Sequence, residues 1–219
     1  GYPAEKIVLG IFANAVSDAA DQVSDAMACG VKKFLLIPPF YFKDCSDEGL
    51  FNWHMQLFAE VDPEASFILY HIPQVSGVPL SLQLIAKLTQ AAPGRVRAIK
   101  DSSGDWENAK ALLDQKATTV LIGDERVLHR AAAMGAGGSI TGMANIYPDR
   151  MKKLFETATE DPIITRDVTQ LLSVPVIPAL KATLATKLNQ PSWERLRPPL
   201  VPLDAKSRAR VLGLEQAEN

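Results

Sequence analysis

The chain has 219 residues, of which 47% are hydrophobic and 22% are charged, a composition typical of a globular protein with a substantial core. The formal net charge of −2 and the pI near 6.0 provide no general attraction for phosphate backbones or anionic lipids, so we expect neither nucleic acid nor membrane as a partner. Two cysteines are too few for a disulfide framework, and no apolar run approaches the roughly 20 residues of a membrane helix, which favours a cytoplasmic protein.

Short apolar runs rich in β-branched and aromatic residues alternate with longer amphipathic stretches, a pattern typical of βα units around a parallel sheet. The expected strands are 6–13, 33–38, 66–73, 96–103, 118–125 and 137–143. The expected helices are 17–30, 48–61, 81–92, 105–115, 125–135, 148–160, about 165–172 and 178–189, followed by a Pro-rich stretch and a final short helix. The first of these helices is expected to begin at a cap, Ser17 or Asp18, and to end at Gly30.

Six strand–helix units are two fewer than a closed (β/α)8 barrel needs, and such a barrel typically has about 250 residues. An open doubly wound sheet is the alternative, but the GxGxxG turn after the first strand is absent. We therefore predict an α/β fold of the TIM-barrel type that is incomplete at the N-terminus. Residues 1–150 are expected to form strands 3 to 8 with their helices, and 151–219 a C-terminal helical segment of the same domain.

Polar side chains follow several of the expected strands at the point where each strand ends. In a barrel these ends share one rim, where enzymes of this architecture carry their chemistry. We expect His71, which alternates to the strand face opposite Tyr70, to point toward the helices, and Asp101 to stabilise structure. Of Asp124 and Glu125, one is expected to contact substrate hydroxyls and the other to cap the next helix. No cluster of His, Cys, Asp and Glu has the spacing of a metal site.

Lys100 ends the expected strand VRAIKDSS and shares a strand face with Ala98 and Val96, so its amine emerges from an apolar row. Most lysines are solvated surface residues, and an unperturbed lysine is neutral in only about one molecule in 2,500 at pH 7. Burial disfavours the charged form and makes an amine a nucleophile toward a carbonyl. Lys100 is therefore the candidate for imine formation, and its nearest competitors, Lys43 and Lys181, are expected to be surface residues.

Tyr70 ends the preceding strand, SFILYHIP, so a parallel barrel brings its ring beside the Lys100 strand at the same rim. A phenol at this place can relay protons to and from a substrate hydroxyl and a carbinolamine. A tyrosine alone more often packs its ring and bonds its hydroxyl to solvent. The pairing with Lys100 favours the catalytic interpretation.

Five sequence runs, PPFYFK, ILYHIPQVSGVPLS, AIKDSSGD, LIGDE and GAGGSITGMAN, together resemble the dihydrodipicolinate synthase and N-acetylneuraminate lyase family of Schiff-base-forming aldolases in order and spacing. The resemblance covers nearly the whole chain. It implies a (β/α)8 barrel, usually a homotetramer built as a dimer of dimers, that needs no cofactor. It also implies a lyase or aldolase that binds pyruvate or another 2-oxo acid as an imine on Lys100, with Tyr70 as the proton relay.

The same resemblance assigns further residues to the site. Tyr41 matches a tyrosine that family members extend across the tight dimer interface into the neighbouring site. The backbone carbonyl of Ile140 is expected to face the imine region. Ser102 and Gly123 fall where the sialic-acid lyases contact the substrate chain. Asp124, chosen for its position after the expected strand and not from the resemblance, completes the expected set of substrate-binding residues.

Two departures from the family pattern bear on function. Dihydrodipicolinate synthases carry an arginine just after the YxxP motif that binds the carboxylate of the second substrate, and the matching residue here is Val75. We therefore favour an N-acetylneuraminate-lyase-like or sugar-acid-like substrate over lysine biosynthesis. The family's GTTGE-type loop, which holds the 2-oxo-acid carboxylate, is absent upstream of KIVLGIFA, so we expect the chain to be a fragment that lacks the first two βα units.

Two other functions remain open from the residues. A non-catalytic binding or regulatory remnant of the family would keep the pocket without the carboxylate-binding loop. A phosphate-ligand binder would use the GAGGSITG loop, although no helix N-terminus or basic group is obvious beside it. We interpret Gly135, Gly137, Gly138 and Gly142 as room for the backbone to approach a substrate, with tight turning as the alternative.

Overall fold

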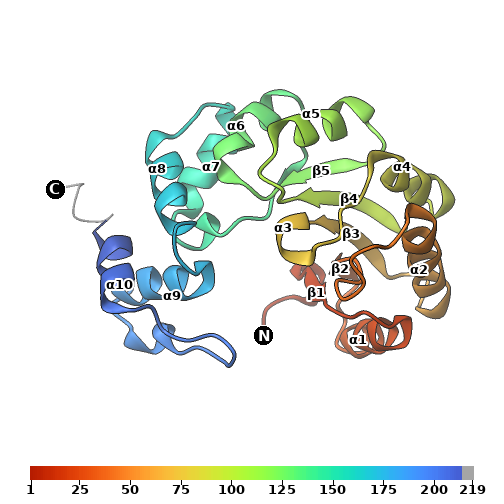
Figure 1. Cartoon of the computed structure of the whole chain (residues 1–219), viewed down its shortest axis with the longest axis horizontal. Coiled ribbons are helices and arrows are strands. Elements are labelled where there is room, and N and C mark those ends of the chain that lie inside the picture. The colour runs from red at the N-terminus through yellow and green to blue at the C-terminus, as the bar shows by residue number, and fades with distance from the viewer. Residues whose placement is uncertain (214–219) are drawn as a thin grey trace. The chain divides into compact units, whose positions relative to one another are not determined.

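The computed structural model describes residues 1–213 and divides the chain into two compact units. The first unit contains residues 1–124 and 134–139, and the second contains residues 125–133 and the chain from Ile140 onward. The sheet lies in the first unit, whereas the second unit is helical (Figure 1). The expected division into 1–150 and 151–219 within one domain stays a prediction.

A parallel sheet forms the first unit, and its strands lie side by side in the order of the chain. The strands are β1 (Leu9–Ile11), β2 (Lys33–Leu36), β3 (Ser66–His71), β4 (Val96–Asp101), β5 (Thr119–Ile122) and β6 (Gly138–Ser139). Because successive parallel strands are joined by right-handed crossovers, the connecting helices of such a sheet all lie on one face, as in a barrel. Within residues 1–213 the sheet has six strands, and the predicted α/β fold of an incomplete (β/α)8 barrel with helices at its C-terminal end is confirmed.

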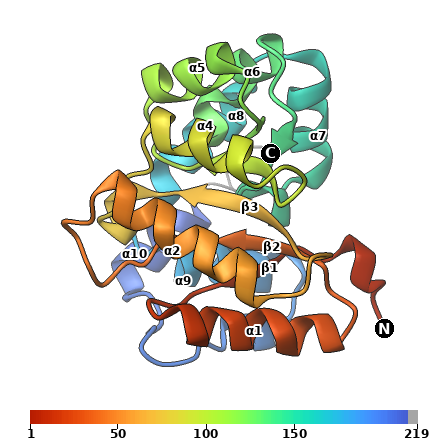
Figure 2. The ribbon, with the colours of Figure 1, turned by 90° about the vertical axis from the view of Figure 1, so that its right-hand side faces the viewer.

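Apart from a short 3-10 helix before β1, the helices of the first unit lie between successive strands, and Figure 2 shows α1 and α2 alongside β1, β2 and β3. They are η1 (Ala4–Lys6), α1 (Val16–Ala28), α2 (Asp47–Glu60), α3 (Pro73–Ser76), α4 (Leu82–Ala91) and α5 (Trp106–Gln115). The side chains of Ser46, Ser81 and Asp105 cap α2, α4 and α5, since each accepts a hydrogen bond from a backbone N–H of the first turn.

Aromatic side chains fill the layer between the sheet and its helices. The Phe67 ring of β3 lies with its centroid 5.7 Å from that of Phe34 on β2 and 4.8 Å from that of Phe58 on α2. Along β3, fully buried residues such as Phe67 and Leu69 alternate with half-buried ones such as Tyr70. The apolar core therefore lies on the helix side of the sheet, and Tyr70 emerges on the other face.

His54 on α2 is a polar residue inside this core, with none of its surface exposed. Its Nδ1 lies 2.7 Å from the backbone oxygen of Leu50, whereas no hydrogen-bond partner within the described residues reaches its Nε2. Burial lowers the pKa of His54 to about 4, and the hydrogen bond to Leu50 opposes this shift only partly. The folded protein therefore holds this imidazole neutral.

This burial predicts a loss of stability in mild acid. The pKa of His54 is lower in the folded chain than in the unfolded one, so the unfolded chain binds the proton first, and the stabilisation present above pH 6.5 is lost as the pH falls toward 4. The difference between about 4 in the folded chain and the ordinary value of 6.5 corresponds to about 3 kcal/mol. We expect urea unfolding at pH 7 and pH 4.5 to show a smaller pH-dependent loss in His54→Leu than in the wild type; equal losses in both proteins contradict this expectation.

The second unit packs helices against one another. Its elements are α6 (Glu125–Ala133), η2 (Met143–Asn145), α7 (Pro148–Thr157), α8 (Pro162–Leu171), α9 (Val176–Lys187), η3 (Pro191–Glu194) and α10 (Ala205–Leu212). Helix α6 packs against α7 and α8, and α9 packs against α8, α10, η2 and η3. Within residues 1–213, no helix combines the length and the hydropathy needed to span a membrane.

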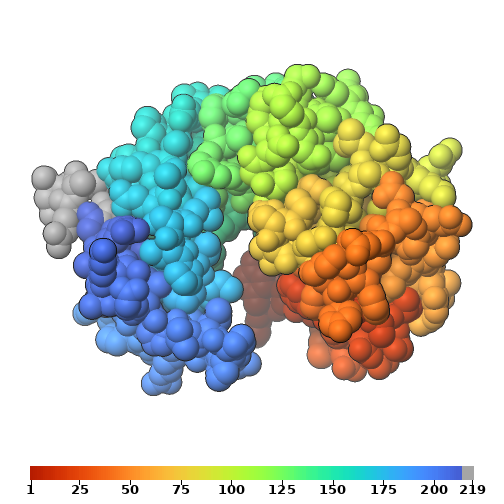
Figure 3. Space-filling view, in the orientation of Figure 1, coloured from red at the N-terminus to blue at the C-terminus, as the bar shows by residue number. Residues whose placement is uncertain are grey.

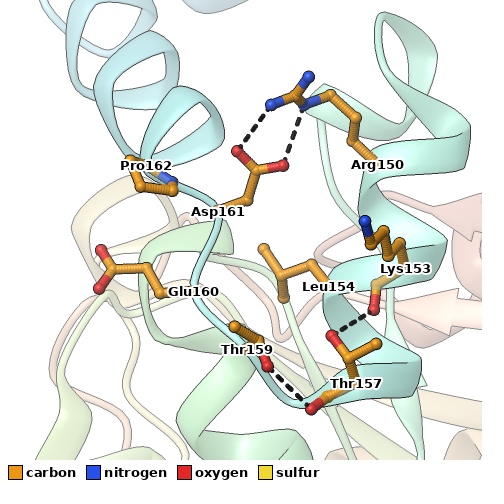
Figure 4. Close-up of a pocket in the computed structure, with 8 residues that line it drawn as sticks. All are labelled: Arg150, Lys153, Leu154, Thr157, Thr159, Glu160, Asp161 and Pro162. Atoms are coloured by element: carbon orange, nitrogen blue, oxygen red, sulfur yellow. Dashed lines mark hydrogen bonds and ion pairs between the residues drawn. The ribbon is translucent and has the colours of Figure 1, made fainter.

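A shallow pocket of about 270 Å³ lies beside the turn between α7 and α8 (Figure 4). Arg150 donates two hydrogen bonds, of 2.9 and 3.1 Å, to the Asp161 carboxylate, which also caps α8 by accepting from the backbone N–H groups of Ile163 and Ile164. Burial alone raises the pKa of Asp161, but the hydrogen bonds from Arg150 and the α8 amides outweigh it and the pKa is lowered. This contact fixes the α7–α8 turn.

Several local predictions were wrong. Helix α1 begins at Val16, and its N-cap Ala15 has no side-chain cap, so neither Ser17 nor Asp18 begins the helix. The expected strand 66–73 ends at His71, and α3 follows it, because Pro73 lacks the N–H that a strand ladder needs and favours the first turn of a helix. The strand expected at 137–143 is a two-residue strand followed by η2.

Candidate active site

Lys100 and Tyr70 lie side by side at the carboxyl ends of β4 and β3, where they are register partners. The Lys100 Nζ donates a hydrogen bond of 3.1 Å to the Tyr70 hydroxyl and lies 4.2 Å from the centroid of the Tyr70 ring. Only 8% of the Lys100 surface is exposed. The expected contact between these two strand ends is therefore confirmed, and the amine lies against a phenol with little access to water.

The sequence pattern predicts that Val96, Ala98 and Lys100 share one face of β4, but β4 does not alternate regularly along its whole length. The register between β3 and β4 shifts by one residue, because Phe67 pairs with Val96 and Ile68 pairs with Ala98, with Arg97 lying between the two pairs on β4. Paired residues of neighbouring strands point to the same face of a sheet, so Val96 lies on the helix side with Phe67, and only Ala98 precedes Lys100 in the row. The irregularity could not be predicted, since period-two alternation assumes an unbroken ladder.

Ser102 and Gly123 lie together just beyond the ends of β4 and β5. The Gly123 N–H donates to the Asp101 carbonyl at 2.7 Å, and the Ser102 N–H donates to the His71 carbonyl at 2.8 Å. A Cβ atom built on Gly123 would lie 1.9 Å from the Ser102 Oγ and 2.8 Å from its Cβ. Gly123 is thus the residue that leaves room for the Ser102 side chain at this rim.

This close approach predicts the effect of a single methyl group. Gly123→Ala is expected to lower the free energy of unfolding by about 1–3 kcal/mol, the usual cost of overpacking a tight contact. Ser102→Gly removes both obstructing atoms, so the double variant should recover part of this loss in thermal or urea unfolding. Strictly additive effects of the two substitutions would contradict the proposed contact.

His71 and Asp101 point away from Lys100 and have structural contacts. The His71 Nδ1 accepts a hydrogen bond of 3.1 Å from the Leu80 N–H, just before α4, and burial lowers its pKa although the charge of Asp101 opposes the shift. The Asp101 carboxylate accepts hydrogen bonds from the Ser103 N–H at 2.9 Å and from the Asn108 amide at 3.1 Å. Both expectations, a helix-side histidine and a stabilising aspartate, agree with these contacts.

Tyr41 protrudes from the loop after β2, and 74% of its surface is exposed. Its backbone N–H donates to the Asn14 side-chain oxygen at 2.8 Å, and its ring meets the Phe42 ring edge-on with centroids 5.3 Å apart. Within the described residues its hydroxyl makes no hydrogen bond, so the structure does not join Tyr41 to the Lys100–Tyr70 pair. Sequence reasoning did not identify Asn14, because an isolated asparagine before a helix carries no distinguishing pattern.

The expected substrate-binding residues beyond β5 differ in their contacts. Asp124 is buried directly after the Gly123 turn. The Glu125 carboxylate accepts a hydrogen bond of 2.8 Å from the Met143 N–H in the second unit and so holds η2. Ile140 follows β6 directly and belongs to the second unit, and its expected place opposite the imine stays a prediction.

The glycines of GAGGSITG make room for side chains of the protein itself. A Cβ on Gly137 would lie 2.3 Å from Thr119 Cγ2, and one on Gly142 would lie 3.2 Å from Leu180 Cδ1. Gly135 and Gly138 have positive φ values, which favour glycine. These glycines therefore serve packing and turning in the fold. Within residues 1–213, no group of three or more His, Cys, Asp and Glu side chains is arranged to hold a metal ion.

The whole chain is similar to proteins of one family. A family model described as the dihydrodipicolinate synthetase family matches residues 5–216. An uncharacterized DapA-like lyase from Chloroflexus aurantiacus is 32% identical over 215 residues, which cover 94% of this chain and 71% of that protein. A 4-hydroxy-tetrahydrodipicolinate synthase from a Cyanothece strain is 27% identical over 226 residues, which cover 98% of this chain and 74% of that protein.

A solved structure agrees with this similarity. The crystal structure of dihydrodipicolinate synthase from Agrobacterium tumefaciens matches the structure of this chain with a TM-score of 0.94 at 36% sequence identity. The match covers 99% of this chain and 76% of the other. The similarity thus extends over both units and includes the strands that carry Tyr70 and Lys100.

Proposed function

The chain belongs to the dihydrodipicolinate synthetase family, a family of lyases, and on this premise we propose that it forms an imine between Lys100 and pyruvate or another 2-oxo acid. The observation that carries the proposal is the buried Lys100 amine, whose Nζ lies 3.1 Å from the Tyr70 hydroxyl at neighbouring strand ends. Burial of an amine calls for a functional explanation, because removing a charged group from water costs free energy. Covalent chemistry with a carbonyl provides one.

The reaction follows from these two groups. In its unprotonated form the Lys100 amine attacks the carbonyl carbon of the 2-oxo acid. The C–N bond forms as the C=O π bond opens, and one of the two amine protons moves to the oxygen, which becomes the hydroxyl of a carbinolamine. Tyr70 gives a proton to this hydroxyl, which leaves as water, and the amine proton that is lost restores the phenol. The resulting imine withdraws electrons from the carbon next to the imine carbon. A bond between that neighbouring carbon and the rest of the substrate can therefore break or form.

We further propose that the second part of the substrate is a sugar acid or a related hydroxylated chain. Val75, at the position where dihydrodipicolinate synthases carry a carboxylate-binding arginine, is 68% exposed and brings no charge to the rim. Ser102 at the same rim offers a hydroxyl to such a chain. A panel of 2-oxo sugar acids and carboxylate-bearing amino-aldehydes separates the two classes; faster turnover of the amino-aldehydes would exclude the proposal.

We also propose a homo-oligomer, a dimer of dimers, that works in the cytoplasm. The protruding Tyr41 supports contact with a neighbouring copy, since a large aromatic side chain that is mostly exposed is typical of an interface. Both cysteines, Cys29 and Cys45, are free, which suits a reducing compartment. Sedimentation velocity of the wild type and of Tyr41→Ala tests the contact, and a monomeric wild type rejects it.

Borohydride reduction in the presence of pyruvate, followed by peptide mass mapping, tests the central proposal. Borohydride converts an imine into a stable secondary amine, so the expected result is one pyruvate-derived adduct on the peptide that contains Lys100. A folded protein that gives no adduct with any 2-oxo acid supports a non-catalytic binding or regulatory role instead. An adduct on another lysine overturns the assignment of the nucleophile.

A further inference from the structure

The Lys43 ammonium joins two loops at the carboxyl ends of the strands. Its Nζ donates hydrogen bonds to the Phe40 carbonyl at 2.5 Å and to the Ser76 carbonyl at 2.7 Å. Phe40 belongs to the loop after β2 that carries Tyr41, and Ser76 is the last residue of α3, after β3. The surfaces of these two segments adjoin in the space-filling view, where residues near 43 are orange and α3 is yellow (Figure 3).

Gly77 makes this contact possible. It ends α3 in the left-handed region, with φ +67°, and a Cβ at this position would lie 2.7 Å from Lys43 Cδ and 2.9 Å from its Nζ. The lysine side chain therefore lies directly over the glycine backbone. Two independent features, a residue without a side chain and an ammonium shared between two carbonyls, hold Lys43 in one place.

Helix α3 needs such support because it has four residues and cannot be stable alone. Its last carbonyl groups lack partners inside the helix, and a lysine that donates to one of them satisfies it. At its other side, Gln74 of α3 donates a hydrogen bond of 2.6 Å to the Ser102 carbonyl. Lys43, α3 and Ser102 thus form one continuous path from the Tyr41 loop to the rim beside Lys100.

We propose that Lys43 is a positioning residue that holds the Tyr41 loop against α3. It thereby positions the loops that would contact the part of the substrate beyond the 2-oxo acid group. The inference rests on the proposed function. Lys100 and Tyr70 lie on strands whose ladder does not involve Lys43, whereas Ser102, Gln74 and Tyr41 lie on the loops that it joins. Imine formation and recognition of the distal chain should therefore respond differently to its loss.

The test compares Lys43→Met with the wild type. Methionine keeps an apolar stem but has no N–H donors. We expect borohydride trapping of pyruvate to proceed within about twofold of the wild-type rate, while kcat/KM for the full substrate falls roughly 10–100-fold, mainly through a higher KM, the range in which lost positioning acts. Lys43→Arg keeps the donors and should restore most of the loss. Lys206→Met, an exposed lysine on α10, is the matched charge control.

Hydrogen exchange provides a readout that needs no activity. In Lys43→Met, the amides of residues 40–45 and 73–77 should exchange faster together, and Lys43→Arg should reverse the change. Unchanged kinetics and unchanged exchange in Lys43→Met overturn the inference, and so does a loss of pyruvate trapping, which would place Lys43 in the imine step. A wild type that never traps a 2-oxo acid rejects the proposed function, while exchange still decides whether Lys43 couples the two loops.

Discussion

Replacing Lys100 with methionine is expected to abolish the borohydride-trapped pyruvate adduct and to lower turnover on the order of 10⁴-fold or more, the scale of losing a catalytic nucleophile. Methionine fills the space beside the Tyr70 ring but has no amine to form the C–N bond. Because the lysine is 8% exposed and its burial is costly, the variant should remain folded and be no less stable. Intact-mass analysis after reduction and urea unfolding measure the two effects.

Lys181 provides the control for this experiment. It lies on α9 in the second unit, with its Nζ 5.4 Å from the centroid of the Trp193 ring, and it was, with Lys43, one of the two competing lysines in the sequence. Lys181→Met should form the Lys100 adduct at the wild-type rate. An adduct that persists in Lys100→Met, or disappears in Lys181→Met, contradicts the assignment.

Tyr70→Phe is expected to slow turnover about 10²–10⁴-fold, the range in which general acid–base catalysis acts. The phenylalanine ring still lies against the Lys100 Nζ, but the hydroxyl 3.1 Å from that atom is gone, so no phenol delivers the proton that carries water away from the carbinolamine. The imine should still form, but slowly enough that borohydride trapping at successive times resolves its rate of formation. Loss of one hydrogen bond should change stability by only about 1 kcal/mol.

Tyr147→Phe separates this catalytic effect from the general cost of a missing phenol. The Tyr147 hydroxyl donates a hydrogen bond of 3.2 Å to the Asp167 carboxylate in the second unit. Its removal should change stability by a similar amount and leave turnover unaltered. Equal rates for Tyr70→Phe and the wild type would exclude Tyr70 as the proton relay.

The sheet and the central pair of the candidate site could be predicted because they follow from regular geometry. Alternating short apolar runs and amphipathic stretches lead to successive parallel strands, and parallel strands bring their carboxyl ends together. Tyr70 and Lys100, each one residue from the end of its strand, are consequently register partners. The assignment of chemistry to this pair depended on the family resemblance as well as on its position.

The features that could not be predicted depend on contacts between irregular segments. Helix α3 is a single turn that follows the β3 strand after one residue, and only Pro73 marks its start in the sequence. Lys43 was expected to be a surface lysine, and it is exposed, but nothing in PPFYFK indicates that its ammonium also joins two backbone carbonyls. Glu125 likewise meets Met143, eighteen residues further along the chain, through a turn that no periodicity describes.

The order of the strands also bears on how the chain acquires its structure during synthesis. Each strand from β2 to β6 pairs with the strand that precedes it in the chain, so a newly made βα unit finds its docking partner already present. The connection between neighbouring strands contains one helix, or two (α3 and α4) between β3 and β4, and such short connections keep the entropic cost of loop closure low. The nascent sheet can therefore grow from the ribosome one strand at a time, with the Tyr70 strand in place before the Lys100 strand emerges.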